Sequence, residues 1–205
     1  MLFRSGFPDF EPPAALLDAL RARLSGGHHQ YPPMAGVLSL REAISSKVAR
    51  HYGAQVNPET EVTVTSGATE AIFVAIQAVV EQGDEVIMFD PAYDAYDPAV
   101  RLAGGRPVHL SLDAPDFQID LEKVKTALTD KTKLIILNSP HNPTGQVISS
   151  DTLQALKALV LSARCYLLSD EVYEHMIFDG ARHESLLRDE ALRARAFVVS
   201  SFGKT

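Results

Sequence analysis

The sequence has little cysteine, no long uninterrupted apolar run and no excess of basic residues. Cys165 is the only cysteine among 205 residues, so no disulfide can form within the chain, and we expect a reducing, cytoplasmic compartment. Charged residues interrupt every long apolar run, and the first residues contain no apolar signal segment, so we expect neither membrane spanning nor secretion. The 19 Lys and Arg are interspersed among 26 Asp and Glu, which predicts no nucleic-acid partner.

Metal-binding patterns are missing too. The seven histidines include the adjacent pair His28-His29, but neither an HExxH nor a CxxC pattern occurs, so we expect no metal site. What remains is a globular composition with 46% hydrophobic and 22% charged residues, which excludes disordered and collagen-like classes. The length predicts one large domain, or one domain with an appendage.

Short apolar segments alternate with amphipathic ones along most of the chain. Strands are predicted at residues 61–65, 85–89, 107–110, 133–138, 166–168 and 197–199. Helices are predicted at residues 13–24, 38–52, 68–82, 96–102, 121–128 and 150–163. This alternation predicts an α/β fold, a three-layer sandwich with a mostly parallel central sheet. Because ligands bind at the carboxyl ends of strands in such sheets, chemical groups are expected directly after strands.

Five motifs directly follow predicted strands: SGATEAIF (66–73), DPAYDAY (90–96), NSPHNPTG (138–145), SDEVYE (169–174) and SSFGKT (200–205). The first begins a helix, whose amino end favours an anion, and the second offers an aromatic ring for a planar ligand. Asp170 and Tyr173 are expected to face the same way on a first helical turn, and Lys204 can act as a nucleophile if desolvated. Taken singly, each motif is better explained as a cap, a turn or a solvated side chain. Their shared position after strands favours a binding site.

In this order and spacing, the five motifs resemble those of the fold-type I, class I and II pyridoxal-phosphate aminotransferases. The segments SGFPDFEPP (5–13) and QYPPMAGVLSLREAI (30–44) are similar to the branch of kynurenine/glutamine and methionine aminotransferases. The resemblance implies pyridoxal 5'-phosphate as the cofactor. It also implies that an amino group moves between an amino acid of the methionine, glutamine or aromatic type and a 2-oxo acid.

The resemblance implies roles for individual residues. Lys204 matches the lysine that holds the cofactor covalently and moves the substrate's α-proton, and Asp170 matches the carboxylate that pairs with the protonated pyridine nitrogen. Tyr93 matches the aromatic side chain that stacks on the ring. The other matches are Tyr173 and Asn142 at the ring's phenolate oxygen, Gly6 and Asn142 at the substrate carboxylate, Ala68, Thr69 and Ser201 at the phosphate, and Tyr31 at the phosphate of a partner subunit.

The resemblance also implies how the chain is organised. Residues 1–35 would form an N-terminal segment that belongs to the small domain and the dimer contacts. Residues 36–205 would form an incomplete cofactor-binding large domain, without the C-terminal small domain, in a homodimer with shared active sites. No arginine here matches the family's clamp for the substrate carboxylate.

Two other functions remain open at this point. A carbon–sulfur β-lyase uses the same cofactor and a similar site, and it would release pyruvate and a thiol without any 2-oxo acid acceptor. A catalytically inert fragment would hold the cofactor without turnover. Robust transamination by the 205-residue chain would exclude the inert fragment.

Overall fold

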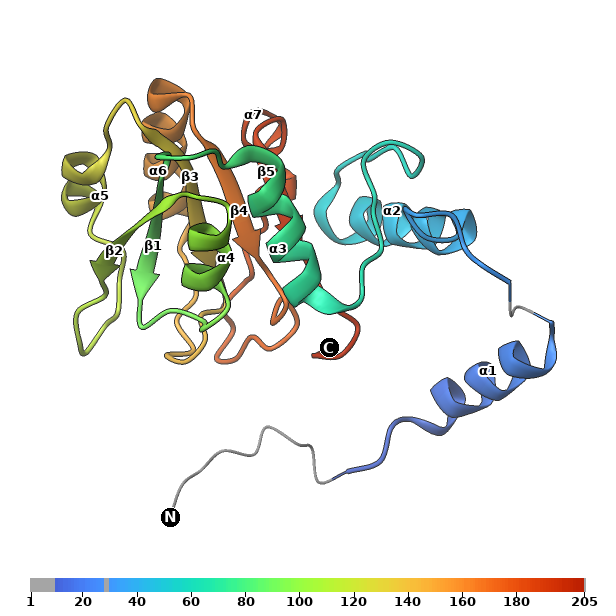
Figure 1. Cartoon of the computed structure of the whole chain (residues 1–205). Coiled ribbons are helices and arrows are strands. Elements are labelled where there is room, and N and C mark those ends of the chain that lie inside the picture. The colour runs from blue at the N-terminus through green and yellow to red at the C-terminus, as the bar shows by residue number, and fades with distance from the viewer. Residues whose placement is uncertain (1–9, 28–29, 205) are drawn as a thin grey trace, which may run out of the picture.

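The computed structural model describes residues 10–27 and 30–204. Its centre is one five-stranded parallel sheet with the strand order β2-β1-β3-β4-β5 (Figure 1). The strands are β1 (Glu85–Asp90), β2 (Arg106–Ser111), β3 (Thr132–Asn138), β4 (Tyr166–Asp170) and β5 (Ala196–Val199). Each lies within two residues of a predicted strand, and the parallel sheet confirms the predicted fold class.

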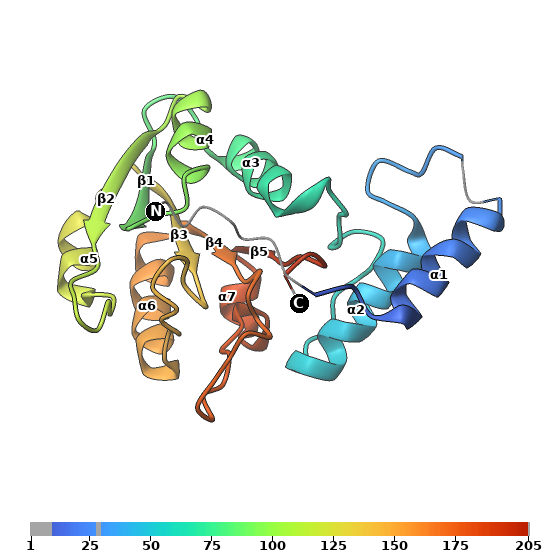
Figure 2. The ribbon, with the colours of Figure 1, turned by 90° about the horizontal axis from the view of Figure 1, so that it is seen from below.

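Helices cover both faces of this sheet (Figure 2). One face packs against α3 (Gly67–Val79) and α4 (Tyr96–Leu102). The other face packs against α5 (Leu121–Ala127), α6 (Ser150–Ala163), α7 (Glu190–Arg193) and the short 3-10 helix η1 (Leu186–Arg188). Alternate side chains of a strand point to opposite faces, so the sheet feeds two separate cores and forms the middle of a three-layer sandwich.

The central strands are buried on both faces, which explains why their sequences are continuously apolar. In β3, the side chains of Leu134 and Ile136 enter one core and those of Ile135 and Leu137 the other, and all four are at most 2% exposed. Burying such a side chain contributes about 1.5–3 kcal/mol. Cys165, just before β4, is also buried, and burial raises the pKa of its thiol.

Two predicted elements are wrong. Residues 61–65 form no strand: Val62 is buried, but the one backbone bond that this segment makes to a distant residue is from Val64 N to Ala35 O, 3.0 Å long. Alternating β-branched residues predict an extended chain, but a strand also needs a neighbour along its length. Asp170 and Tyr173, expected on one first helical turn, are not in a helix: Asp170 ends β4, and residues 172–175 form turns.

Two further helices precede α3 in the chain. Helix α2 (Leu38–Tyr52) packs through Val48 and Tyr52 in a small cluster with Ala54, and Leu187 lies against it. Helix α1 (Ala14–Ser25) has no buried residue and stands apart from the other elements in Figure 1.

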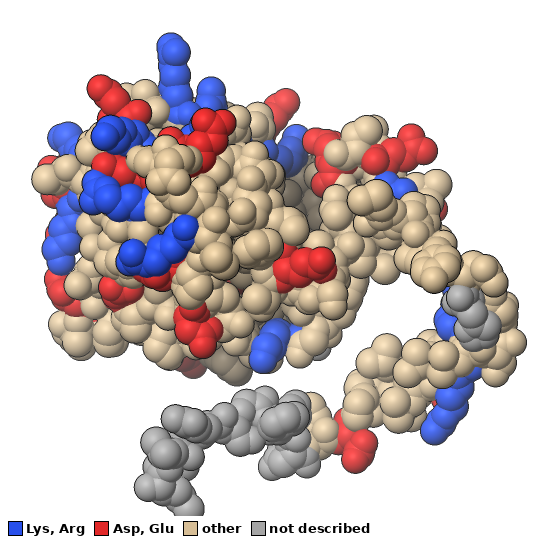
Figure 3. Space-filling model, in the orientation of Figure 1, with Lys and Arg blue, Asp and Glu red and all other residues tan. Residues whose placement is uncertain are grey.

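The surface agrees with the interspersed charge of the sequence. In the space-filling view, Lys and Arg lie beside Asp and Glu over the body without a patch of one sign (Figure 3). Within the described parts of the chain, no helix is long and apolar enough to cross a membrane.

Candidate active site

The predicted site residues gather where the parallel strands end. Four of the five motifs follow β1, β3, β4 and β5, and the fifth, SGATEAIF, follows the extended segment 61–65. Because the strands are parallel, these four motifs emerge at one edge of the sheet.

Asp170 lies at the centre of this edge as the last residue of β4, and it is only 4% exposed. Its carboxylate accepts hydrogen bonds from Tyr96 Oη (2.6 Å) and from Val172 N (3.3 Å). Burial raises the pKa of Asp170, and these two hydrogen bonds offset only part of that shift. Within the described chain no Lys, Arg or His forms an ion pair with it, so the site holds a buried carboxylate that lacks a cation.

Tyr96 is a site residue that the sequence analysis missed. It starts α4, is 3% exposed, and donates its hydroxyl to Asp170. Burial, then Asp170, raises the pKa of Tyr96, so the phenol stays protonated and remains a donor. The ring of Tyr93 packs edge-on against it with centroids 5.6 Å apart. Two tyrosines three residues apart in DPAYDAY indicate two rings on one side of a helical turn, but the resemblance assigns a role to Tyr93 alone.

The loop after β3 is held by Asn138, which is buried at the strand's last position. Its amide nitrogen donates to Asp170 O (2.9 Å), and its carbonyl oxygen accepts from Asn142 N (2.8 Å). Asn142 is thereby fixed by its backbone, while its side chain keeps its donors for another partner. His141 forms a hydrogen bond with Thr144 Oγ1 (2.8 Å) within the loop, and burial lowers its pKa.

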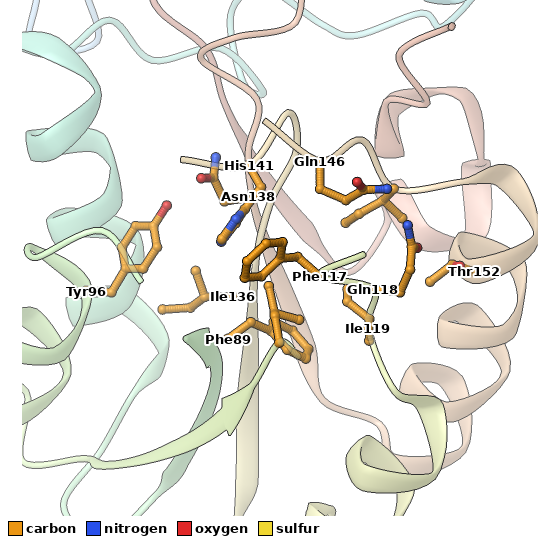
Figure 4. Close-up of a pocket in the computed structure, with 12 residues that line it drawn as sticks. Phe89, Tyr96, Phe117, Gln118, Ile119, Ile136, Asn138, His141, Gln146 and Thr152 are labelled. Atoms are coloured by element: carbon orange, nitrogen blue, oxygen red, sulfur yellow. The ribbon is translucent and has the colours of Figure 1, made fainter. Parts of the chain in front are cut away.

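A small pocket lies beneath this loop (Figure 4). Asn138 and His141 line it on the side of Tyr96, and Phe117 and Gln146 line it on the side of α6. Its lining includes Tyr96 of α4, the donor to Asp170, so the pocket adjoins the Asp170 edge.

The amino end of α3 reaches the same edge. Thr69 Oγ1 lies 3.2 Å from Tyr93 Oη, which connects the helix to Tyr96 and Asp170. Ser66, the N-cap, makes no side-chain cap, so capping does not explain this residue. The carboxylate of Glu70 accepts from Ser66 N, which satisfies that amide within the chain.

Thus Thr69, Tyr93, Asp170 and Asn142 are joined by a chain of contacts through Tyr96 and Asn138. A model of the family "Aminotransferase class I and II" matches residues 1–205. The chain belongs to the class I and II aminotransferases.

Several aminotransferases of known name are similar to it. The chain is 46% identical to a methionine aminotransferase of Escherichia coli K12, over 98% of this chain and 52% of that protein. The solved structure of an E. coli methionine aminotransferase superimposes with a TM-score of 0.95. The match includes 98% of this chain and 53% of the E. coli chain. A probable N-succinyldiaminopimelate aminotransferase of Mycobacterium tuberculosis is 43% identical over 97% of this chain and 51% of its own length. The predicted family is confirmed, and this aminotransferase chain spans about half the length of these relatives.

The polar and aromatic groups at this edge of the sheet fit pyridoxal phosphate. A buried carboxylate without a cation suits a protonated ring nitrogen, and an aromatic ring and amide donors lie beside it. Tyr173 is half-buried and lies close to Tyr96. The hydroxyl of Tyr173 helps to raise the pKa of Tyr96. Ala68 is half-buried in the first turn of α3.

The aminotransferase chain does not bring every predicted residue to this group. Lys204 is exposed rather than desolvated, although it follows β5 at the same edge, and Ser201 Oγ accepts from Gly203 N within its own loop (3.0 Å). Tyr31 is fully exposed and apart from the group, and Gly6 lies outside the described residues, as do His28 and His29. Among the described residues, no cluster of His, Cys, Asp and Glu could hold a metal ion.

Proposed function

We propose that this chain is the cofactor-binding part of a pyridoxal-phosphate aminotransferase, which moves an amino group between an amino acid and a 2-oxo acid. The observation that carries the proposal is Asp170, a carboxylate 4% exposed at the carboxyl end of a parallel strand, with hydrogen-bond donors but no cation from residues 10–27 or 30–204. A buried charge of this kind is costly unless a ligand completes it. The names of the relatives support the same activity.

When bound, pyridoxal phosphate supplies an electron-poor ring that accepts the electron pair left after the substrate loses its α-proton. Asp170 would keep the ring nitrogen protonated, with Tyr96 holding the carboxylate in place. Tyr93 would stack on the ring and fix its plane. Asn142 and Tyr173 would donate to the ring oxygen. Among the described residues, Asn142 is held through its backbone N–H, and its side-chain amide has no hydrogen-bond partner.

The proposal assigns the remaining residues by the family's pattern. The first-turn amides and side chains of Ala68 and Thr69, with Ser201, would bind the phosphate. Lys204 Nζ would hold the cofactor and move the proton at the substrate α-carbon. Gly6 and Asn142 would bind the substrate carboxylate, and Tyr31 would reach the phosphate of the other subunit of a homodimer.

The organisation and the substrate class belong to the same proposal. Residues 1–35 would join the small domain and the dimer contacts, and residues 36–205 the large domain. The similarity to a methionine aminotransferase and to a kynurenine–oxoglutarate transaminase, 46% and 38% identical, supports amino acids of the methionine, glutamine or aromatic type. We place the enzyme in the cytoplasm because its single cysteine is unpaired.

The test uses the protein as its gene encodes it. Adding pyridoxal phosphate should give a visible absorbance band, and borohydride should then fix the cofactor on Lys204, as peptide mass spectrometry would show. Lys204→Ala should abolish this covalent attachment while the protein stays folded. An unchanged band in Lys204→Ala would refute the role of this lysine. Pyruvate and thiol released from cystathionine without a 2-oxo acid would instead identify a β-lyase.

A further inference from the structure

A second buried carboxylate lies four residues after Asp170. The side chain of Glu174 is 1% exposed, and three donors from two separate segments meet on it. Oε1 accepts from Lys47 Nζ and from Ser200 Oγ, and Oε2 accepts from Tyr52 Oη. Lys47 and Tyr52 belong to α2, whereas Ser200 directly follows β5.

Glu174 is the anchor of the segment that carries Lys204. In the part of the chain that the structure describes, no other hydrogen bond or ion pair joins residues 200–204 to another element. The bond from Gly203 N to Ser201 Oγ stays inside the segment. The course of the chain after β5 therefore depends on where Glu174 holds the Ser200 hydroxyl.

The charge state of Glu174 suits this role. Burial raises the pKa of Glu174, but the hydrogen bonds from Lys47 and Ser200 more than offset that effect, and the pKa lies below its usual value. The group is therefore ionised at neutral pH and presents only acceptors to its three donors. A glutamine of the same size would present an NH₂ group to at least one of these donors. A carboxylate accepts from all three donors at once and also balances the charge of Lys47.

We propose that Glu174 is a positioning residue, which acts through Ser200 to fix residues 200–204 against α2. In this way it sets where Ser201 and Lys204 lie relative to Asp170. The anchoring itself follows from the contacts, whereas its consequence for the cofactor rests on the proposed function. Lys47 and Tyr52 hold the carboxylate from the other side, so α2 is coupled to the lysine segment through one side chain.

The first test measures anchoring without any cofactor. Hydrogen exchange of the amides of residues 200–204 is followed by mass spectrometry in the wild-type protein, Glu174→Gln and Ser200→Ala. Losing one hydrogen bond to a buried charge is expected to raise exchange about tenfold in both variants. Ser200→Thr keeps the hydroxyl and should return exchange to near the wild-type rate.

The matched control is Asp189→Asn. Asp189 forms a half-buried ion pair with Lys157 (2.6 Å) and caps α7, so this variant also removes a charge with a lowered pKa. Its contacts lie at α6 and α7 rather than at residues 200–204. It is expected to lower the melting temperature without changing exchange in that segment.

The second test measures the dissociation constant of pyridoxal phosphate. Glu174→Gln and Ser200→Ala are each expected to weaken binding about tenfold, and the double variant should be no weaker than Glu174→Gln alone, because both act through one contact. Asp189→Asn should bind like the wild-type protein. If Glu174→Gln does not fold, Ser200→Ala carries the test, since it leaves the Lys47 and Tyr52 contacts intact.

Two results would overturn the inference. One is wild-type exchange in residues 200–204 of Ser200→Ala. The other is an equal change in Asp189→Asn, which would reduce the effect to general destabilisation. A wild-type protein that binds no pyridoxal phosphate would refute the proposed function, and the exchange measurement would then decide the anchoring alone.

Discussion

Asp170 and Glu174 are two buried carboxylates four residues apart, and they differ in their partners and in the direction of their pKa shifts. Glu174 has a lysine and two hydroxyl donors, and its pKa is lowered. Asp170 has one phenol and one backbone amide but no cation among the residues that the structure describes, and its pKa is raised. A carboxylate that the chain completes by itself stabilises the fold, whereas one left without a cation is available for a positively charged group from outside.

The largest expected effect is on the stability of the cofactor-free protein. Glu174→Gln leaves Lys47 without its partner, so the free energy of unfolding at neutral pH should fall by about 3 kcal/mol. Because the pKa of Glu174 is lowered on folding, this contribution exists above its ordinary value of 4.5 and is lost as pH falls through the lowered pKa. Urea denaturation of both proteins at several pH values measures the loss of unfolding free energy and its dependence on pH.

Asp170→Asn is the matched comparison in the same measurement. Because its pKa is raised on folding, the ionised form of Asp170 costs stability at neutral pH, and removing the charge should leave stability equal or higher. The same variant should lose tight binding of pyridoxal phosphate. A loss of stability as large as that of Glu174→Gln would end the contrast between the two carboxylates.

A smaller effect is expected from Tyr96→Phe. It removes the donor on Asp170 while keeping the ring in the core, so unfolding should be easier by about 1–2 kcal/mol. The pKa of Asp170 should rise further, and pyridoxal phosphate should dissociate more readily. Equilibrium denaturation and a cofactor titration measure these changes. Unchanged cofactor affinity would show that Tyr96 is only a packing residue.

The smallest effect extends the comparison to a half-exposed site. His109 lies between Asp90 (3.0 Å) and Asp97 (2.9 Å), which raise its pKa above the ordinary 6.5. Its contribution should be complete below pH 6.5 and lost as pH rises through the raised pKa. Since solvent and Arg101 also screen Asp97, we expect only about 0.5 kcal/mol. A difference between wild type and His109→Gln that does not shrink with rising pH would contradict this.

The parts of the fold that the sequence predicts well are those dictated by local pattern. The apolar run 133–138 indicates a strand buried on both faces, and the structure has one at Thr132–Asn138. The helix predicted at residues 121–128 forms as α5, and Asp120 caps it by accepting from amides two and three residues later, so its signal is local. The segment 61–65 was misjudged because a strand depends on a neighbour elsewhere in the chain.

The candidate site divides in the same way. Asp170 and Asn142 are predicted from motifs that follow strands, and the structure places Asp170 at the end of β4 and Asn142 in the loop after β3. Glu174 stands in the same motif as Asp170, but its partners lie 127 and 122 residues away in α2, so local pattern suggests only a solvated side chain. Tyr96 is likewise recognised only once α4 is packed against the end of β4.

The buried Cys165 gives the protein a built-in reporter of its own opening. Its thiol is 1% exposed between α6 and β4, and its raised pKa keeps it protonated, so a thiol reagent reaches it only when this part of the core separates. With no second cysteine to compete, the labelling rate of the unmodified chain measures how often the sheet's central layer comes apart. The labelling rate of Cys165 can therefore rank the effects of bound cofactor and of substitutions at Glu174 on this opening.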